Sequence, residues 1–240
     1  MSPAAEAATD NALPILFRDR WLCAIDKPCG LMVHKTVRSD DRVFALQSLR
    51  DQLGQRVWPL HRLDRATSGV LLFALDAETA AVVGHQIMSR SVAKRYLAVV
   101  RGFTELSGRI DHPLSTGDQR LPQAAVTCYR RLATMELPEP VGRYPVARYS
   151  LVEIQPETGR THQIRRHLKH LFHPLVGDTT YGEGRHNRLF RQRFGCHRLL
   201  LHAVELGLLH PRTQQRLEIR APTRGSFRRI EEAFLRHSLQ

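Results

Sequence analysis

The chain has 240 residues, with 36 lysines and arginines against 23 aspartates and glutamates, which gives a net charge of +13 before histidine is counted. This length suits one large domain or two small ones, and the charge favours a polyanionic partner, whether RNA, DNA or an anionic membrane surface. The four cysteines lie far apart, no apolar run could span a membrane, and the first residues lack a secretory pattern. We therefore expect a cytoplasmic protein with free thiols.

Residues 1–13 are rich in alanine, which predicts a disordered tail, and no linker or repeat interrupts residues 14–240, which predicts one domain. Apolar runs bounded by turn residues predict strands at 22–27, 57–60, 70–75, 93–101, 126–132, 148–154, 199–209 and 215–220. Periodic segments with end signals predict helices at 44–53, 77–89, 162–171 and 227–237. Strands in runs, with helices between them, favour an α+β fold with a mainly antiparallel mixed sheet.

Several local signals mark the ends of these elements. Asp76 and Thr161 are placed to cap the helices that follow them, and Gly54 is placed to end the first helix. Residues 67–69, Thr-Ser-Gly, predict a tight turn between two strands.

The run HRLDRATSG at 61–69 places one carboxylate, Asp64, between Arg62 and Arg65 in the connection between two apolar strands. Flanking cations would keep this carboxylate ionised, as a nucleophile or base acting on a polyanion requires. In an extended chain Arg62 and Asp64 lie on the same side. The spacing alone also allows a turn cap with surface arginines beside it.

The run ETGRTHQIRRHL at 157–168 predicts a helix whose apolar stripe includes Ile164 and Leu168. Arg165 lies about 100° from Ile164, at the border of the stripe, whereas Arg166 lies about 200° away and faces solvent. Arg165 is therefore the better placed to reach a partly buried carboxylate, and Arg166 to bind phosphate. The alternative is that both arginines lie on a solvated basic helix.

The segment 181–198 interleaves arginines, among them Arg188 and Arg191, with Tyr181, Phe190 and Phe194. It could clamp RNA through charge and stacking, or it could be a solvated basic loop.

Four histidines crowd the region 162–173, but neither H-E-x-x-H nor a Cys/His set is present. We therefore expect a basic surface here rather than a metal site. The chain also lacks a P-loop and the G-x-G-x-x-G pattern.

HRLDRATSG and ETGRTHQIRRHL, with DKPCGLMVH at 26–34 and KRYLAVVRG at 94–102, resemble the motifs of the RluA-type pseudouridine synthases, in family order. These enzymes isomerise uridine to pseudouridine in RNA. The resemblance covers nearly all of residues 15–222. It implies one pseudouridine synthase catalytic domain over 14–240, without an S4 RNA-binding domain.

The resemblance also implies roles for the matching residues. Asp64 would act at C1′ of the target nucleotide, either by direct attack or by assisting elimination to a glycal, and the sequence leaves both routes open. Arg165 would pair with Asp64 and keep it ionised, and Arg62 would fill the space left by the flipped base. Tyr96 would stack on the uracil and is a candidate base for the C5 proton, although a strand position also permits a core tyrosine.

The RNA-binding side chains expected are Arg62, Arg65, Arg166, Lys169, Arg188 and Arg191. Lys27 and its neighbours in the turn Lys-Pro-Cys-Gly are expected to shape the site rather than to react. Cys29 departs from the serine that family members often carry. Because the isomerisation adds no atoms, we expect no cofactor and no metal.

Three stretches, 48–72, 123–134 and 158–178, most resemble the branch of the family that modifies uridine 65 of tRNA. We therefore expect a tRNA-modifying isomerase that works as a monomer, with no membrane and no obligate protein partner. Two alternatives remain. One is an enzyme of the same family acting on rRNA or another tRNA site, and the other is an RNA-binding or chaperone protein that does no chemistry.

Overall fold

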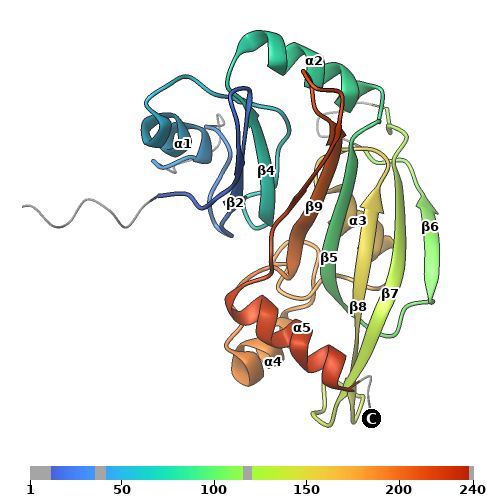
Figure 1. Ribbon diagram of the computed structural model, residues 1–240. Coiled ribbons are helices and arrows are strands. Elements are labelled where there is room, and N and C mark those ends of the chain that lie inside the picture. Colours follow the sequence, from blue (N-terminus) through green and yellow to red (C-terminus); the bar gives the residue numbers. More distant parts are fainter. Residues whose placement is uncertain (1–11, 36–41, 116–120, 238–240) are drawn as a thin grey trace, which may run out of the picture. The chain divides into compact units, whose positions relative to one another are not determined.

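In the computed structural model, the described residues are 12–35, 42–115 and 121–237, and they form ten strands and five helices (Figure 1). The six strand pairings with an assigned register are all antiparallel. The predicted α+β class with a mainly antiparallel sheet is therefore confirmed. No helix in the described part of the chain is long and apolar enough to cross a membrane.

The elements belong to two compact units. One unit contains the chain up to Val92 together with Gly207–Ala221, and the other contains Ala93–Leu206 together with the chain from Pro222 onward. The chain passes from one unit to the other three times, so neither unit is a continuous segment.

The first unit is built around two fully buried strands. It contains β1 (Ile15–Arg18), β2 (Leu22–Lys27), α1 (Ala45–Leu53), β3 (Trp58–Pro59), β4 (Ser68–Ala74), α2 (Ala77–Met88) and β10 (Arg216–Arg220). Strand β2 pairs with β1 and β4, and every residue of β2 and β4 is buried. Burial on both faces explains why the apolar runs 22–25 and 70–74 show no alternation with polar residues.

Two of the predicted helix ends in this unit are confirmed. Gly54 ends α1 in the left-handed conformation at φ 66°, and the Asp76 carboxylate accepts the Thr79 N–H at 2.7 Å at the start of α2. The predicted turn at 67–69 is wrong, because β4 already begins at Ser68. The turn lies earlier, where the Thr67 N–H donates to the Asp64 carbonyl at 3.0 Å.

Leu13, the last residue of the predicted tail, belongs to the folded part. Its side chain is buried, and its N–H donates to the Gln52 side chain at 2.8 Å. Residues 1–11 of that tail lie outside the described residues.

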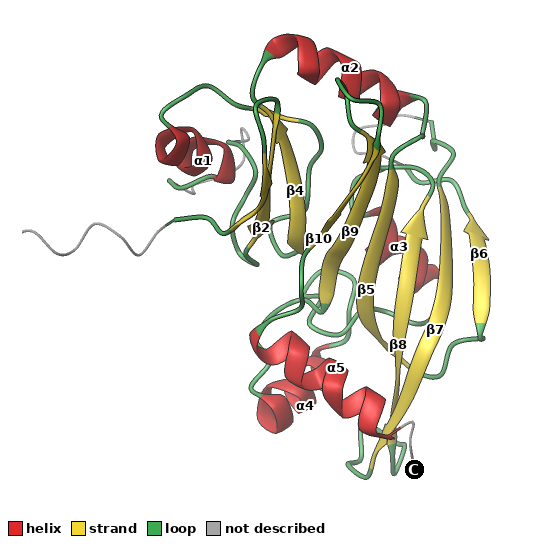
Figure 2. Cartoon of the chain, in the orientation of Figure 1, coloured by secondary structure: helices red, strands yellow, loops and turns green. Residues whose placement is uncertain are grey.

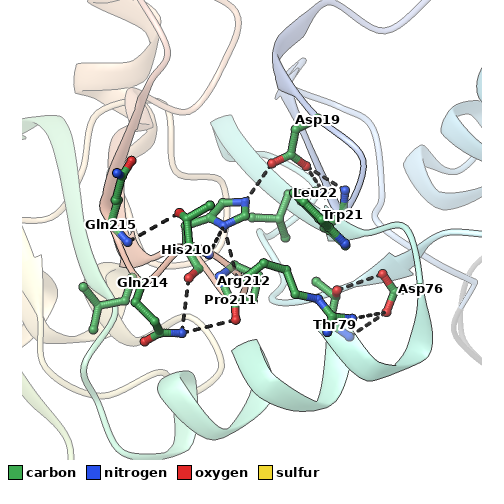
Figure 3. A network of polar contacts seen from close by, with 12 residues as sticks. Asp19, Trp21, Leu22, Asp76, Thr79, His210, Pro211, Arg212, Gln214 and Gln215 are labelled. Atoms are coloured by element: carbon green, nitrogen blue, oxygen red, sulfur yellow. Dashed lines mark hydrogen bonds and ion pairs between the residues drawn. The ribbon is translucent and has the colours of Figure 1, made fainter.

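Strand β10 pairs with β9 (Leu201–Leu209), and one histidine holds the turn that connects them (Figure 3). His210 Nε2 contacts the Asp19 carboxylate at 2.7 Å, while His210 Nδ1 accepts the backbone N–H of Thr213 at 3.1 Å. The same aspartate accepts the N–H groups of Trp21 and Leu22, each at 2.7 Å. A neutral imidazole that donates from Nε2 and accepts at Nδ1 satisfies both sides.

The second unit contains the longer strands. Its elements are β5 (Ala93–Arg101), β6 (Ser107–Asp111), β7 (Val126–Leu137), β8 (Ala147–Pro156), most of β9 (Leu201–Leu209), α3 (Gln163–His170), α4 (Gly184–Phe194) and α5 (Gly225–His237). The strand order is β9–β5–β8–β7–β6. The sequence predicted six of these eight elements as helix or strand, five at nearly these bounds and β7 with its end five residues too early. It missed β6 and α4, as it missed β1 in the first unit.

Different helices pack on the two faces of this sheet. Leu97 and Val99 of β5 pack in one buried cluster with Phe190 of α4 and Phe227 of α5. In Figure 2, α5 lies in front of the strands of this unit and α3 lies behind them. Because side chains alternate along a strand, Tyr96 lies on the face away from that cluster, which is the side of α3.

Candidate active site

The predicted catalytic residues come from both units. Asp64 and its flanking arginines belong to the first unit, whereas Tyr96 and Arg165 belong to the second.

The loop that carries Asp64 connects β3 to β4 and shows alternating exposure. Arg62 and Arg65 are exposed, Leu63 between them is buried, and Asp64 is half-buried. Leu63 therefore anchors the loop, while the charged residues on either side stay accessible. At the start of the loop, His61 Nε2 accepts the Leu72 N–H from β4 at 3.1 Å, which fixes the entry to the loop.

The turn at 28–30 braces the other end of this loop. The antiparallel register pairs Lys27 at the end of β2 with Gly69 at the start of β4, so the two segments meet. The Gly30 N–H donates to the Arg65 carbonyl at 2.8 Å, and Arg65 Nε donates back to the Gly30 carbonyl at 3.1 Å. The Cys29 thiol contacts the Ala66 carbonyl at 3.1 Å, a bond that a serine hydroxyl could also make.

Lys27 is completely buried and acts as a cationic tie within this turn. Its Nζ donates to the carbonyls of Pro28 and Leu31 at 2.8 and 2.7 Å, and it lies 3.4 Å from that of Arg65. A buried ammonium needs such acceptors, since an uncompensated charge is costly in the interior. The expectation that this turn shapes the site rather than reacting agrees with these contacts.

In the second unit, α3 is fixed to β7 by two buried polar side chains that were missed in the sequence. Gln163 donates to the Val126 carbonyl and the Thr127 hydroxyl at 2.9 and 3.0 Å, and accepts the Thr158 hydroxyl at 2.7 Å. His167, four residues later and therefore on the same helix face, contacts the same Thr127 hydroxyl at 2.8 Å. Burial lowers the pKa of His167, in keeping with a neutral structural histidine.

The predicted cap of α3 is wrong. Thr161 is exposed, and the N-cap position is His162, which has a left-handed backbone at φ 54° and no side-chain capping bond. Instead, His162 Nδ1 contacts the Tyr181 hydroxyl at 3.0 Å. The predicted apolar stripe is confirmed, since Ile164 and Leu168 are both buried.

Arg165 is buried and makes a two-pronged ion pair with Asp178, an aspartate that the sequence analysis did not single out. Arg165 Nε and Nη2 donate to the two Asp178 oxygens at 2.7 and 2.9 Å. The Asp178 carboxylate also accepts the N–H groups of Thr180 and Tyr181 at 2.8 and 2.9 Å. Burial alone would raise the pKa of Asp178, but these hydrogen bonds outweigh it and lower the pKa.

An aromatic ring and an asparagine side chain also help to orient the Arg165 guanidinium. The Arg165 guanidinium carbon lies 5.0 Å from the centre of the Tyr181 ring, within the range of a cation–π contact. The Asn187 side chain donates to the Asp178 carbonyl at 2.9 Å and accepts the Gly177 N–H at 2.7 Å. Arg165 is therefore held in one orientation by a loop that is itself bonded to α4.

The other predicted residues of this unit differ in exposure. Tyr96 is half-buried on β5, whereas Ala98 and Val100 on the same face are fully buried. Arg166 is half-buried rather than solvent-facing, because its Nη1 donates to the Ser115 carbonyl at 2.7 Å. Lys169 is exposed.

The basic segment 181–198 is mainly the helix α4, not a loop. Arg188 and Arg191 lie on its exposed side, while Phe190 is 1% exposed and belongs to the core. The predicted stacking of Phe190 on RNA is therefore wrong, and what α4 presents to solvent is positive charge. Among the described residues, no group of three or more metal-ligating side chains is arranged to hold an ion.

Comparison with known proteins identifies the class to which this fold and these motifs belong. Residues 22–170 match the family described as RNA pseudouridylate synthase, so the chain belongs to that family, whose members are isomerases. A solved structure, human RNA pseudouridylate synthase domain containing 1, shares 26% identity at a TM-score of 0.70 and covers 96% of this chain and 97% of its own.

More similar relatives carry a particular name. A protein of Vibrio cholerae serotype O1 is 48% identical over 87% of this chain and 90% of its own length. A protein of Pasteurella multocida is 49% identical over 86% of this chain and 90% of its own length. Both are named tRNA pseudouridine synthase C, so the RluA-type resemblance and the prediction of an isomerase are confirmed.

Replacing Lys27 with methionine should destabilise the first unit by about 1–3 kcal/mol, because the carbonyls of the turn and of Arg65 lose a buried donor. Urea unfolding measures the change, and hydrogen exchange at the Gly30 amide should accelerate. The matched control is Lys35→Met, an exposed lysine of the same unit, which should change stability by less than about 0.5 kcal/mol. Equal stability of the two variants would contradict the bracing role.

Replacing Asp178 with asparagine should destabilise the protein by about 3–5 kcal/mol at neutral pH, because it removes the charge of the buried Asp178 carboxylate from its pair with the Arg165 guanidinium. The matched control is Asp111→Asn, whose surface pair with Arg109 at 2.8 Å should contribute at most about 1 kcal/mol. Denaturant unfolding of both variants measures the difference.

The same comparison has a defined pH dependence. Since the pKa of Asp178 is lowered on folding, its stabilisation is complete above the unfolded value of about 3.9 and is lost as pH falls through the lower folded value. The gap between wild type and Asp178→Asn should therefore narrow below about pH 4. A gap that stays constant on acidification would show that the carboxylate charge is not what stabilises the fold.

Proposed function

We propose that this protein isomerises uridine to pseudouridine in tRNA, at position 65, as a cytoplasmic monomer that needs no cofactor. The observation that carries the proposal is the 48% and 49% identity to two proteins named tRNA pseudouridine synthase C. The motif around Asp64, which lies in a braced and partly exposed loop, supports a reaction at this residue.

Asp64 is the residue that acts at C1′ of the target nucleotide. Its loop is bonded at one end to β4 through His61 and at the other to the 28–30 turn, so the carboxylate starts from a fixed position. A prepositioned group lowers the entropic part of a barrier. Direct attack at C1′ and assisted elimination to a glycal both begin from this arrangement.

Arg165 supplies the positive charge that keeps Asp64 ionised during the reaction. A guanidinium stays protonated throughout the physiological range, so the pair does not depend on pH near neutrality. Asp178 and Tyr181 orient Arg165 from its other sides and do not themselves touch the nucleotide in this proposal. They are positioning residues.

In this proposal Tyr96 stacks on the flipped uracil, and Arg62 fills the space that this base leaves in the RNA stem. The half-buried ring of Tyr96 retains accessible surface for stacking, unlike its buried neighbours Ala98 and Val100. Arg62 is exposed two residues before Asp64, at a place where a long side chain can enter a stem.

The remaining RNA contacts are electrostatic. Arg65, Lys169, Arg188 and Arg191 are exposed, and Arg166 presents part of its side chain while it is bound to Ser115. Phosphate contacts of this kind supply affinity without reading sequence.

Replacing Asp64 with asparagine should abolish pseudouridine formation and leave tRNA binding within about threefold of wild type. Removal of the nucleophile eliminates the chemical step, while the phosphate contacts remain. Purified enzyme is incubated with an unmodified tRNA transcript, and pseudouridine is mapped by carbodiimide labelling and primer extension. Circular dichroism and unfolding of the variant serve as the control for folding.

The outcomes separate the competing functions. Pseudouridine at position 65 of tRNA supports the proposal, and modification of rRNA or of another tRNA position refutes the assigned site. If wild type binds RNA but forms no pseudouridine in either RNA, the protein is a binding protein and the proposed chemistry is wrong.

The double variant Arg188→Ala, Arg191→Ala should reduce the slope of log binding constant against log salt by roughly 2, because two phosphate contacts are lost. Filter binding of tRNA over a range of salt concentrations measures the slope. Arg228→Ala on α5 is the control, since Glu232 already binds its guanidinium at 2.9 Å. An unchanged slope in the double variant would exclude α4 from the RNA interface.

A further inference from the structure

The end of helix α3 has an unusual residue in its terminal turn. Phe172 has a left-handed backbone with φ 61°. Its N–H donates to the Lys169 carbonyl at 2.9 Å, and the His173 N–H donates to the Leu168 carbonyl at 2.9 Å. This pair of bonds is the Schellman pattern, in which glycine usually occupies the left-handed position because a Cβ atom is disfavoured there.

The phenylalanine ring does not compensate for this backbone by packing inside the protein. Phe172 is 80% exposed, so it buries little apolar surface. The other non-glycine residues with positive φ in the described part of the chain are polar: Arg90, His162 and Gln214. Backbone preference and hydrophobic burial both disfavour Phe172, and such a violation of local rules points to a function outside folding.

The surroundings of the ring are basic. Lys169 and His170, in the last turn of α3, are exposed, and the His170 ring stacks on that of His112 at 3.9 Å. Arg101, at the end of β5, donates from Nη2 to the Phe172 carbonyl at 3.2 Å and is also paired with Glu183. Lys169, whose ammonium lies 5.8 Å from the centre of the Tyr181 ring, precedes the turn by one helical turn, and the Arg101 guanidinium lies at its carbonyl.

The turn that carries the ring is rigid. The His173 ring contacts the Arg101 carbonyl at 2.8 Å, and the Arg101 N–H donates to the Pro174 carbonyl at 3.0 Å. The backbone on both sides of Phe172 is therefore hydrogen-bonded, so little backbone entropy would be lost when a partner binds to this turn.

We propose that Phe172 is a stacking platform for an unpaired base of the RNA substrate, with Lys169 binding the adjoining phosphate. The inference rests on the proposed function, because it takes RNA as the partner. An exposed aromatic ring beside cations has the chemistry of an unpaired nucleotide site, in which a base stacks and a phosphate is neutralised. A protein partner would call for a contiguous apolar patch, whereas the exposed neighbours of the ring on α3 are charged or polar.

The test compares the variant Phe172→Gly with Phe172→Tyr. Glycine suits φ 61°, so Phe172→Gly should unfold at the same temperature as wild type or a higher one. In the inactive Asp64→Asn background, its dissociation constant for a tRNA transcript should rise about 5- to 150-fold, the range that one base–aromatic stack contributes. Phe172→Tyr keeps an aromatic face and should bind like wild type.

Leu106→Ala is the matched control, since Leu106 is 67% exposed in the same unit but carries no ring, and its binding should not change. The inference is overturned if Phe172→Gly binds tRNA as wild type does, or if Phe172→Tyr loses as much affinity as Phe172→Gly. If wild type forms no pseudouridine in tRNA, the proposed function fails separately. The binding comparison then still decides whether the ring contacts RNA.

Discussion

The buried ion pair between Arg165 and Asp178 fixes the position of Arg165, on which the second unit's part of the candidate site depends. A guanidinium at this depth needs a full set of acceptors, and the Asp178 oxygens provide a two-pronged one. The same carboxylate accepts two backbone N–H groups, so the loop after it must fold back on it. Gly177, directly before Asp178, allows this path, since a Cβ atom there would lie 1.9 Å from the Arg198 carbonyl oxygen.

The first unit also contains a buried cation, Lys27. Its ammonium donates to the carbonyls of Pro28 and Leu31 in its own turn and lies 3.4 Å from the carbonyl of Arg65. These bonds tie the 28–30 turn to the loop that carries Asp64.

The sequence was most informative where local chemistry decides the structure. Strand β2 and the ends at Gly54 and Asp76 were predicted correctly, because burial pattern and capping act over a few residues. Helix α4 was missed because its exposed arginines hide a short apolar face that only Phe190 and its tertiary contacts reveal. Asp178 was overlooked because its partner Arg165 lies thirteen residues away in the sequence, so no local pattern marks the pair.

The motif residues Gln163 and His167 show the limit of reasoning from polarity. His167 was expected to belong to a basic surface, and Gln163 was not singled out. Both are buried, because hydrogen bonds to β7 and to the loop carbonyl of His112 satisfy them. Their spacing of four residues is the signal that could have shown a shared face. Such buried polar anchors fix a helix in rotation and position more narrowly than an apolar stripe does.

Helix α3 is bounded by two left-handed residues, and the contrast between them bears on function. At its start, His162 has a structural reason for its conformation, since its ring meets the Tyr181 hydroxyl at 3.0 Å beside Arg165. At its end, Phe172 satisfies the backbone pattern of the turn but exposes its ring to solvent. Contacts within the protein therefore explain the left-handed residue at the start of the helix, whereas for the exposed ring at its end we propose contact with an RNA base.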